Sequence, residues 1–403
     1  MALDLQSGQS YWLLRNHELP AYPEFTRNEH AQVLIVGAGA TGALAAALLA
    51  EAGIDVVIVD SRALACGSTG ASTALISYEP DISLARLGAM RGHDSAVRAY
   101  QLARDANRAL GGMVQRLGID CHYETASSFH LARSAEQAAA LVEEHTLRNR
   151  AGFECNFAST AALSQDYGLV GAAALISGDA AQLDPVRLTS GCLQFAVARG
   201  ARCYRARVTQ LDHRGETVRA LTEAGRHIDA EHIAFATGYE TQERLREPGV
   251  ELTSTYAIAT DARTVLHAWL RRAILWDMDA PYHYLRSADG CVLVGGGDEP
   301  FVDADARDSL MPEKTAALER YLAAILPDLG DSELVSAWCG TFAKTADGLA
   351  YIGERDGAYY MLGYGGNGIT FGMLGAMFLR DRLLTGPHAG EALFAFGRLL
   401  RSP

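Results

Sequence analysis

The sequence predicts an α/β fold with α+β character overall, and three observations carry this prediction. Residues 32–60 have the pattern of a strand, a helix and a second strand, and both strands are continuous apolar runs. Such runs are typical of a parallel sheet that is covered on both faces. The alternation of strands and helices stops near residue 63 and resumes only near residue 184. A last apolar helix is predicted at 367–384, and Gly386-Pro387 ends it.

Each further element follows from its local pattern. Helical spacing of Ala, Leu and Arg predicts helices at 82–118 and 135–150, with strands between them at 122–134. Residues 184–215 indicate a helix, a turn and a strand, and residues 230–240 indicate a buried strand that ends in Ala-Thr-Gly. Residues 282–296 have the pattern of a hairpin around Asp289-Gly290.

The composition excludes several classes of function. The 403 residues are 49% apolar and 21% charged, which is typical of a globular enzyme of about two domains. A net charge of -13 argues against binding to nucleic acid or to an anionic membrane, because both need basic patches. The apolar run at 31–50 contains three glycines at strand–turn–helix spacing, so we do not predict a membrane span.

The cysteines and histidines indicate the compartment and the absence of a metal site. The seven cysteines are scattered without a C-x-x-C pair, and no N-terminal signal is visible, so we expect a cytoplasmic protein with reduced thiols. The twelve histidines show no metal-ligand spacing, so no metal is expected. No pattern indicates an oligomeric state.

A dinucleotide-binding loop is predicted at the first strand–helix turn. Gly37, Gly39 and Gly42 form a G-x-G-x-x-G pattern, in which the glycines allow the tight turn, the approach of a pyrophosphate and close helix packing. Phosphates would lie at the helix N-terminus. Asp60 ends the second strand and is placed to accept hydrogen bonds from an adenosine ribose. These residues fit NAD and FAD equally, although an NAD domain would be expected to continue with further βαβ repeats.

Several motifs in a fixed order resemble one family of FAD enzymes. They are the glycine loop, "DSR" at 60–62, "GSTGASTA" at 67–74, "DP" at 184–185, Val208, "ATG" at 236–238, "DGCVLVGG" at 289–296, "WCGTFAKTADGLAYIG" at 338–353 and "GGNGI" at 365–369. Together they resemble the superfamily of D-amino-acid oxidase, glycine oxidase and sarcosine oxidase. Within it, the chain looks most like the bacterial γ-glutamylputrescine-oxidase branch.

The resemblance implies a discontinuous FAD-binding domain of the glutathione-reductase type, interleaved with a substrate domain built on an antiparallel sheet. The implied FAD domain comprises 1–90, 180–245 and 338–403, and the implied substrate domain comprises 91–179 and 246–337. It also implies FAD as the cofactor and these FAD-binding residues: Gly37, Gly39, Ala40, Thr41, Gly42, Asp60, Ser61, Arg62, Ser68, Thr69, Gly70, Ala71, Ser72, Thr73, Val208, Thr237, Gly238, Gly366, Asn367, Gly368, Ile369 and Thr370.

The sequence departs from the family pattern at three positions. Amino-acid-oxidising members have an Arg that clamps the substrate carboxylate, and Phe342 stands at the matching position. Where sarcosine oxidase relatives attach FAD to a Cys, this chain has Gly340, and Cys339 is one residue away, on the opposite face of a strand, so we predict noncovalent FAD. Leu293 stands where some relatives have an oxygen-activating Lys, so oxidase and dehydrogenase both remain open.

Three residues are candidates for catalysis or substrate binding. Lys344 is one of only two lysines and would anchor an anionic group or stabilise negative charge on reduced flavin; a surface lysine is the alternative. Tyr284 and Arg286 share one face of a predicted strand that, by the resemblance, borders the substrate cavity, where Arg286 would replace the carboxylate anchor; an ordinary amphipathic strand of the sheet is the alternative. Glu79 or Asp81 would attract an amine cation, although a helix N-cap is the favoured role of Asp81.

The expected reaction is oxidation of a C–N bond of an amine or amino-acid-like substrate. Hydride would pass to N5 of the flavin, and the imine would then hydrolyse. The electron acceptor would be O2 or another acceptor. The alternatives are an NAD(P)-linked dehydrogenase and a flavoprotein dehydrogenase or electron-transfer module that acts on a non-amine.

Overall fold

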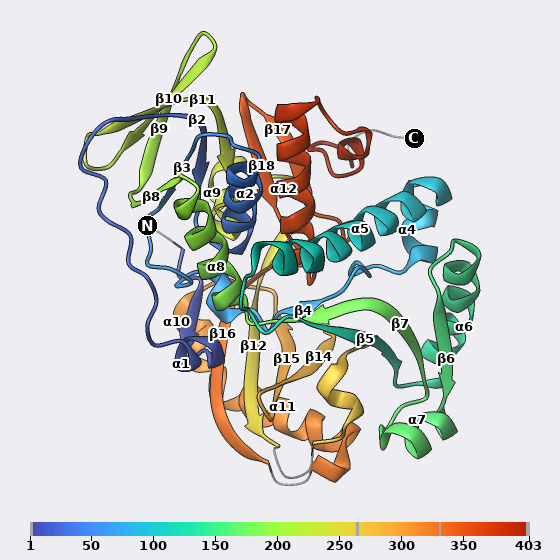
Figure 1. The fold of residues 1–403 in the computed structure, drawn as a ribbon. Helices are drawn as coiled ribbons and strands as arrows, with labels where there is room; N and C mark the ends of the chain where they lie inside the picture. The colour runs from blue at the N-terminus through green and yellow to red at the C-terminus, as the bar shows by residue number, and fades with distance from the viewer. Residues whose placement is uncertain (1–2, 263–265, 330–331, 400–403) are drawn as a thin grey trace.

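Two β-sheets form the frame of the protein, and the predicted mixed α/β class is confirmed (Figure 1). The computed structural model describes residues 3–262, 266–329 and 332–399. One sheet has eight strands and lies in the upper part of Figure 1, and the other has ten strands and lies below it.

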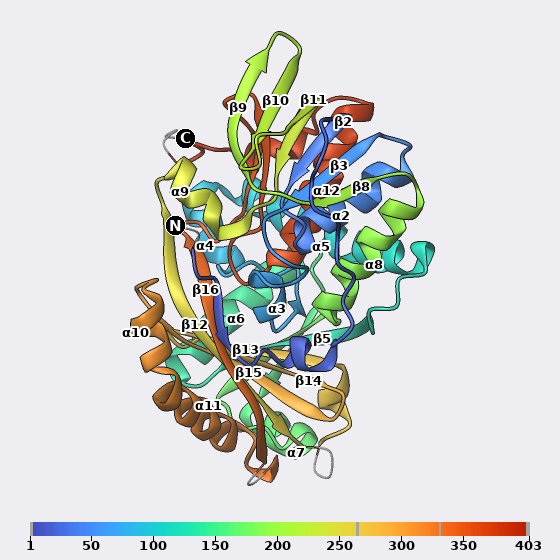
Figure 2. The same cartoon turned by 90° about the vertical axis from the view of Figure 1, so that its left-hand side faces the viewer.

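The eight-stranded sheet contains the predicted βαβ unit in its parallel core. The core strands, in spatial order, are β18 (Ala358–Leu362), β11 (His227–Phe235), β2 (Glu29–Val36), β3 (Val56–Asp60) and β8 (Arg202–Arg205). β17 (Tyr351–Arg355) lies antiparallel to β18, and β9 (Val208–Arg214) and β10 (Thr217–Thr222) form a hairpin that joins β11. This hairpin extends beyond the rest of the sheet (Figure 2). The middle of β2 is fully buried, as its continuous apolar run predicted.

Helices cover one face of this sheet. α2 (Ala40–Glu51) lies beside α8 (Pro185–Ala198) and α12 (Gly368–Leu384), and α5 (His93–Leu117) crosses α12. α2 and α12 are buried over most of their length, which is why they are apolar on nearly all sides. The predicted helix at 82–118 is divided into α4 (Leu84–Arg91) and α5 at Gly92, whose φ of 84° only glycine adopts easily.

The ten-stranded sheet is antiparallel except between β13 and β5. Its strands are β1 (Gln6–Gly8), β16 (Glu333–Thr345), β12 (Val250–Asp261), β15 (Cys291–Glu299), β14 (His283–Ala288), β13 (Ala273–Asp277), β5 (Glu124–Ala132), β7 (Ala173–Gln182) and β4 (Leu75–Ile76), with β6 (Cys155–Ser159) on β7. The predicted hairpin is β14–β15. Asp289 and Gly290 both have positive φ, as a two-residue turn between twisted strands requires.

The ten-stranded sheet packs against α11 (Met311–Ile325) through Leu318, Leu322 and Ile325. The remaining helices are α1 (Tyr11–Arg15), α3 (Ser68–Ala71), α6 (Ala135–Arg150), α7 (Thr160–Tyr167), α9 (Thr241–Leu245) and α10 (Ala304–Ser309), with 3-10 turns at Gly238–Glu240, Trp269–Arg272, Pro327–Leu329 and Ala389–Leu393. None of the helices in the described ranges has the length and apolar character needed to span a membrane.

The two sheets alternate along the chain, and the predicted domain boundaries remain a prediction. Strands of the eight-stranded sheet come from three stretches, at 29–60, 202–235 and 351–362. β16 crosses the predicted boundary at 338 but belongs to the ten-stranded sheet over its whole length. β1 and β4 lie within the predicted FAD-domain stretch 1–90, and they also belong to the ten-stranded sheet. A division of the chain would therefore have to assign these three strands separately.

Candidate active site

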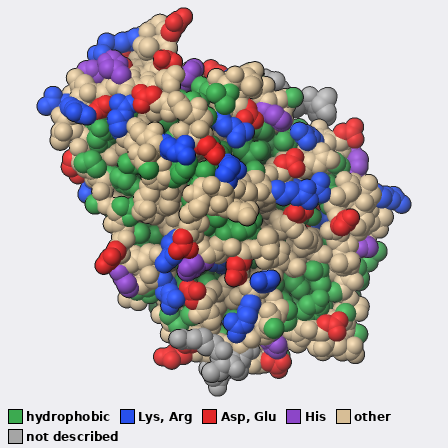
Figure 3. Space-filling view, viewed as in Figure 1, with side chains coloured by type: hydrophobic (Ala, Val, Ile, Leu, Met, Phe, Trp, Pro, Cys, Tyr) green, Lys and Arg blue, Asp and Glu red, His purple; other side chains and the backbone are tan. Residues whose placement is uncertain are grey.

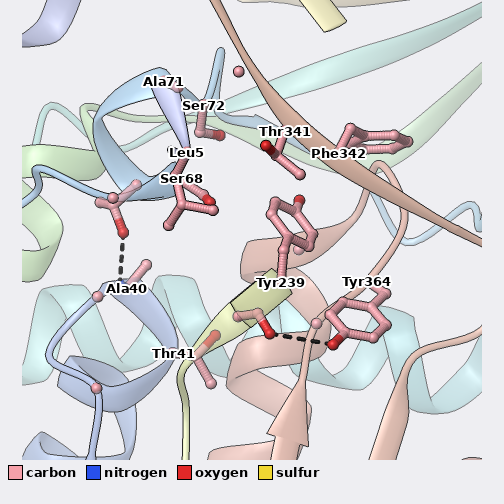
Figure 4. A pocket seen from close by; sticks show the side chains of 18 of the residues that line it. Leu5, Ala40, Thr41, Ser68, Ala71, Ser72, Tyr239, Thr341, Phe342 and Tyr364 are labelled. Atoms are coloured by element: carbon pink, nitrogen blue, oxygen red, sulfur yellow. Dashed lines mark hydrogen bonds between the residues drawn. The ribbon is translucent and has the colours of Figure 1, made fainter. Parts of the chain in front are cut away.

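A cavity of about 490 Å³ is lined by residues from both sheets. This volume is within the range of small-molecule and cofactor sites. Figure 4 shows part of its wall: Thr41 and Ser68 come from the glycine loop and the loop after β3, Tyr239 follows β11, and Thr341 and Phe342 lie on β16. The cavity therefore joins the predicted dinucleotide loop to the antiparallel sheet.

The glycine loop has the backbone that the motif predicts. Gly37 has a φ of 108°, and a Cβ there would lie 2.4 Å from the carbonyl oxygen of Ala236 on the neighbouring strand. A Cβ on Gly42 would lie 1.9 Å from the carbonyl oxygen of Gly37. Larger residues at these two positions would push the start of α2 away from the sheet. The loop thus holds a helix N-terminus, where phosphates bind well, at the cavity.

Asp60 ends β3 on the cavity wall and is already hydrogen bonded to the backbone. Its carboxylate accepts from the N–H of Ala38 at 2.7 Å and from the N–H of Arg62 at 2.8 Å. Burial raises the pKa of Asp60, and these two N–H groups oppose that effect. Arg62 pairs with Glu240 at 2.7 Å, and Val208 lines the same region. The predicted adenosine-end residues therefore lie together.

The loop at 67–74 packs directly against the glycine loop. The Thr69 hydroxyl accepts from the N–H of Ala40 at 3.0 Å. The indole N–H of Trp338 donates to the carbonyl of Ala71 at 2.8 Å, and that of Trp12 donates to the carbonyl of Ser72 at 2.7 Å. Two tryptophans from distant segments thus fix the backbone of this loop at the cavity.

The last glycine cluster leads into α12 at the opposite side of the cavity. Asn367 is the N-cap, and its amide donates to the carbonyls of Ser77 at 2.6 Å and Glu79 at 3.0 Å. The N–H of Gly366 donates to the Asp81 carboxylate at 2.6 Å. The N-terminus of a 17-residue helix therefore begins at the cavity wall, in contact with the segment that follows the loop at 67–74.

Most of the predicted FAD-binding residues line this one cavity. Those on its wall are Gly37, Gly39, Ala40, Thr41, Asp60, Ser61, Arg62, Ser68, Thr69, Ala71, Ser72, Thr73, Val208, Thr237, Gly238, Gly366, Asn367, Gly368 and Ile369.

Three of the predicted FAD-binding residues lie behind the wall. Gly42 packs against Gly37. Gly70 lies under the loop, where its N–H donates to the carbonyl of Ala65 at 3.1 Å. The hydroxyl of Thr370 donates to the carbonyl of Ser77 at 2.9 Å and lies 2.6 Å from Oδ1 of Asn107, because this face of α12 is turned toward α5. These residues support the wall rather than form it.

The three catalytic candidates are not equally placed. Tyr284 lines the cavity, together with Tyr282. Lys344 lies two residues beyond Phe342 on β16, and its Nζ is 2.9 Å from a carboxylate oxygen of Asp298. Its side chain is 38% exposed. Lys344 is therefore beside the cavity but engaged by an acid.

Arg286 lies behind the cavity wall, so its position does not favour the predicted role as a carboxylate anchor. The Arg286 guanidinium lies against the ring of Trp12 and next to the loop that contains Ala74. The residue is 2% exposed, and its guanidinium donates to the carbonyls of Ala74 at 3.1 Å and Leu183 at 2.8 Å. Burial lowers the pKa of Arg286 to about 10, so the group stays charged at neutral pH.

Two acids of the cavity wall, Asp81 and Glu79, differ from each other in their contacts, and the expected N-cap role of Asp81 is wrong. Asp81 is not an N-cap: Ser83 caps α4 and accepts from the N–H of Arg86 at 3.2 Å. Asp81 instead faces the cavity. Glu79 also reaches the wall, but its carboxylate is bound by the Arg148 guanidinium and by the hydroxyls of Ser128 and Ser177.

Other wall residues carry no local motif. Leu5 reaches the cavity because β1 pairs with β16, with Gln6 opposite Gly340. Tyr239 and Trp276 also line it. Aromatic residues after a strand are too common to mark a site, so only the tertiary arrangement reveals them.

The strand geometry at 339–342 agrees with the expectation of noncovalent FAD. Gly340 and Phe342 line the cavity, whereas Cys339 lies on the opposite face of β16, with its Sγ 3.4 Å from Oδ1 of Asp308. Alternation along the strand accounts for the difference. Leu293 is fully buried in the core.

One group of possible metal ligands lies outside the cavity wall. Asp277, Asp279 and His283 have ligand atoms within 4.8 Å of one another. Asp279 is paired with Arg133 at 3.0 Å, and one oxygen of Asp277 accepts from the N–H groups of Asp279 and His283. These contacts explain the cluster as a brace for the loop between β13 and β14.

A glycine loop at a helix N-terminus, an acid at the end of the next strand and a cavity that continues to a second sheet define a dinucleotide-dependent enzyme. Residues 32–382 match the family described as FAD dependent oxidoreductase (DAO). Because the match covers most of the chain, the protein belongs to this family and is an FAD-dependent oxidoreductase. The alternative of an NAD(P)-linked dehydrogenase is therefore set aside.

Known proteins are similar over nearly the whole chain. The chain is 25% identical, over 421 residues, to gamma-glutamylputrescine oxidoreductase from Escherichia coli (strain K12), with 98% of this chain and 95% of that protein covered. The crystal structure of glycine oxidase from Geobacillus kaustophilus superposes with a TM-score of 0.74 at 20% identity, covering 90% and 96% of the two chains. L-amino acid deaminase from Proteus vulgaris superposes with a TM-score of 0.75 at 19% identity, covering 96% and 100%. At these identities the two structures describe the shared fold.

Proposed function

We propose that the protein oxidises a C–N bond of an amine that has no carboxylate on the reacting carbon. The observation that carries this proposal is the wall of the cavity at β16. Phe342 occupies the position of the expected carboxylate clamp, and Arg286 lies behind the wall. The Lys and Arg side chains found among the described wall residues are Arg62, Arg207 and Arg244, which all belong to the half formed by the eight-stranded sheet.

The named relatives give the chemical class. One is a gamma-glutamylputrescine oxidoreductase, and the fold is also that of a glycine oxidase and an L-amino acid deaminase. All three names describe chemistry at nitrogen-bearing substrates. We carry over the amine and not the amino acid, because the described wall residues on the side of the ten-stranded sheet include no Lys or Arg to bind an α-carboxylate.

The chain's own residues would bind FAD in one direction along the cavity. Asp60, Arg62 and Val208 would hold the adenosine, and the glycine loop with Ser68 and Thr69 would hold the pyrophosphate. The N-terminus of α12 would face the flavin ring with about half a positive charge, which stabilises negative charge there. Bound FAD would supply the hydride acceptor.

The aromatic residues would position the substrate and exclude water. Tyr282 and Tyr284, Trp276 and Phe342 line the cavity on the side of the ten-stranded sheet. Proximity and orientation in a dry pocket are what C–H cleavage next to a neutral amine requires. We further propose that no general base is needed, that O2 or another acceptor removes the electrons, and that the protein is cytoplasmic.

An anaerobic flavin-bleaching screen tests the proposal. Purified protein with bound FAD is mixed with primary amines, N-methyl amines, D- and L-amino acids and 2-hydroxy acids, and absorbance near the flavin maximum is followed. We expect amines to reduce the flavin fastest. Reduction by 2-hydroxy acids only, or reduction by a partner protein with none by any amine, would reject the proposal in favour of a non-amine dehydrogenase or an electron-transfer flavoprotein. Hydrogen peroxide formed in air would identify an oxidase.

The predicted role of Lys344 has its own test. If Lys344 anchors an anionic group or stabilises reduced flavin, Lys344→Ala lowers turnover or changes the flavin spectrum. If its role is to neutralise Asp298, both properties stay close to those of the parent protein. The two outcomes are distinguished by one spectrum and one rate measurement, with Lys314→Ala as the control at the only other lysine.

A further inference from the structure

The substrate side of the cavity carries an acid that has no cationic partner. Among the described residues, no Lys, Arg or His forms an ion pair with Asp81. Its carboxylate accepts from the N–H of Gly366 at 2.6 Å and otherwise faces the cavity. A Cβ placed on Gly366 would lie 2.6 Å from Oδ1 of Asp81 and 2.9 Å from the hydroxyl oxygen of Tyr282, so these groups converge on one point of the wall.

The neighbouring charges leave one negative charge at this place. Lys344 is engaged by Asp298 at 2.9 Å, and both influence Asp81 electrostatically in opposite senses. Two carboxylates and one ammonium therefore leave a single uncompensated carboxylate. The other acid on this wall, Glu79, has both carboxylate oxygens occupied: it is bound by Arg148, which also pairs with Glu144, and by the hydroxyls of Ser128 and Ser177. Of these two wall acids, Asp81 is the one whose carboxylate remains available to a cation in the cavity.

Aromatic rings surround the same place. The rings of Tyr282 and Tyr284 lie 5.7 Å apart, and those of Tyr239 and Phe342 lie 6.5 Å apart. All four line the cavity. The faces of aromatic rings attract ammonium groups, and a carboxylate among them forms a suitable site for an organic cation.

The site at Asp81 favours a charged ammonium group, whereas the nitrogen next to the carbon that is oxidised must be neutral. A carboxylate stabilises the charged form of a bound amine, whereas the neutral form donates hydride. Partial removal from bulk water at the cavity wall, with Asp298 in addition, raises the pKa of Asp81 to about 6. An alkylammonium group in water has a pKa of about 10, so Asp81 is a much weaker base than the amine and does not readily take its proton. Asp81 is therefore poorly suited to generate the reactive amine and well suited to hold an ammonium group that keeps its proton.

We propose that Asp81, held in place by the N–H of Gly366 and flanked by Tyr282, binds a second cationic group of the substrate, away from the carbon that is oxidised. The substrate class is then a diamine, or an amine with a distal ammonium group. This inference rests on the proposed amine oxidation and adds the chemistry of the substrate's far end. Asp81 would thus determine substrate specificity, because it favours substrates with a positive charge at the end away from the reacting carbon.

Matched pairs of small amines test the inference on the wild-type holoenzyme. The compounds are 1,4-diaminobutane with butylamine, 1,6-diaminohexane with hexylamine, and 6-aminohexanoate, which has an anion at the far end. We expect the half-saturating concentration for anaerobic flavin reduction to be at least about tenfold lower for a diamine than for its monoamine. We expect 6-aminohexanoate to be the weakest of the six-carbon compounds.

The variant Asp81→Asn tests the residue. Asparagine has the same shape and keeps an oxygen that accepts from Gly366, so the wall is preserved while the charge is removed. The ratio of monoamine to diamine half-saturation should fall to about one. Asp305→Asn is the matched control, because Asp305 is an exposed acid in the first turn of α10, outside the cavity, and its variant changes the net charge equally.

The outcomes distinguish failure of the second cation site from failure of the proposed amine oxidation. If no amine reduces the flavin, the proposed function fails. If amines reduce it but wild-type protein treats diamine and monoamine alike, the function stands and the second cation site is rejected. The site is also rejected if Asp81→Asn keeps the preference. If Asp81→Asn loses FAD, the wild-type protein still decides whether the second cation site exists. Its preference for diamine over monoamine should then be present at low salt and lost at high salt.

Discussion

At the scale of single residues, Asp81 links substrate preference to pH. Its pKa of about 6 means that the carboxylate is ionised above that pH and neutral below it. Asp298, Lys344, Tyr239, Tyr282 and Tyr284 are the titratable groups around it. Burial raises the pKa of all three tyrosines, so they stay neutral across this range.

The expected result is a diamine preference that declines as pH falls. Between pH 7.5 and pH 5 the ratio of monoamine to diamine half-saturation should decrease, with its midpoint near pH 6. Both amines stay protonated in solution over this range, so their own titration does not produce the change. The measurement is the ratio from anaerobic reduction at each pH. A ratio that is constant with pH in wild-type protein would contradict the assignment.

Arg286 is expected to stabilise the fold rather than bind substrate. Arg286→Met would leave the buried carbonyls of Ala74 and Leu183 without donors, at a cost of about 1–3 kcal/mol for each. We expect a lower urea midpoint for Arg286→Met and a smaller decrease for Arg286→Lys, which keeps the charge. Unchanged unfolding together with a large loss of amine turnover would instead support the anchor role that the sequence suggested.

At the scale of elements, the turn that starts α12 should govern cofactor affinity. A side chain on Gly366 would meet the Asp81 carboxylate at 2.6 Å, which is a movable group, and would also enter the cavity. Gly366→Val should therefore weaken FAD binding by at least about tenfold while the urea midpoint of the apoprotein changes little. Fluorescence titration of apoprotein with FAD measures the affinity.

A matched glycine checks that the effect is local. Gly178 is exposed on β7, and no atom lies within 4 Å of the Cβ that a side chain would add there. Gly178→Val should bind FAD like the parent protein. If both variants lose FAD equally, the effect is general instability and the turn at Gly366 has no special role.

The elements also show what local sequence can and cannot predict. The glycine loop, the strand 56–60 and the helix 368–384 were predictable because their backbone conformation and burial depend on the pattern of consecutive residues. Asp81 was misjudged because its partner, Gly366, is 285 residues away. β1 and the place of Leu5 at the cavity were missed for the same reason, since pairing with β16 leaves no local pattern.

At the scale of the whole molecule, FAD should stabilise both sheets together. The cavity is lined by residues of the eight-stranded and the ten-stranded sheet, so a bound cofactor would contact both. A ligand that binds only the folded state adds about 4 kcal/mol of stability at a concentration a thousand times its dissociation constant. We expect one cooperative melting transition for holoprotein, and a lower melting temperature for apoprotein. Calorimetry of the two forms measures both, and an equal melting temperature would argue against a cofactor shared by the sheets.

The charge distribution agrees with a small-molecule substrate. On the face drawn in Figure 3, basic and acidic side chains are interspersed. This face offers no broad basic surface for a polyanion, in keeping with the net charge of -13. The charge that matters for the proposed substrate lies inside the cavity.

The wall of the cavity also sets the time at which the cofactor is captured in the cell. Residues 37–41 lie on it together with residues 340–342 and 363–369, which the ribosome adds about 300 residues later. A nascent chain that has released only the βαβ unit offers the phosphate loop but neither β16 nor the N-terminus of α12. Stable loading with flavin therefore waits until residues 340–369 have left the ribosome. A shortage of riboflavin during expression should accordingly yield full-length apoprotein rather than stalled fragments.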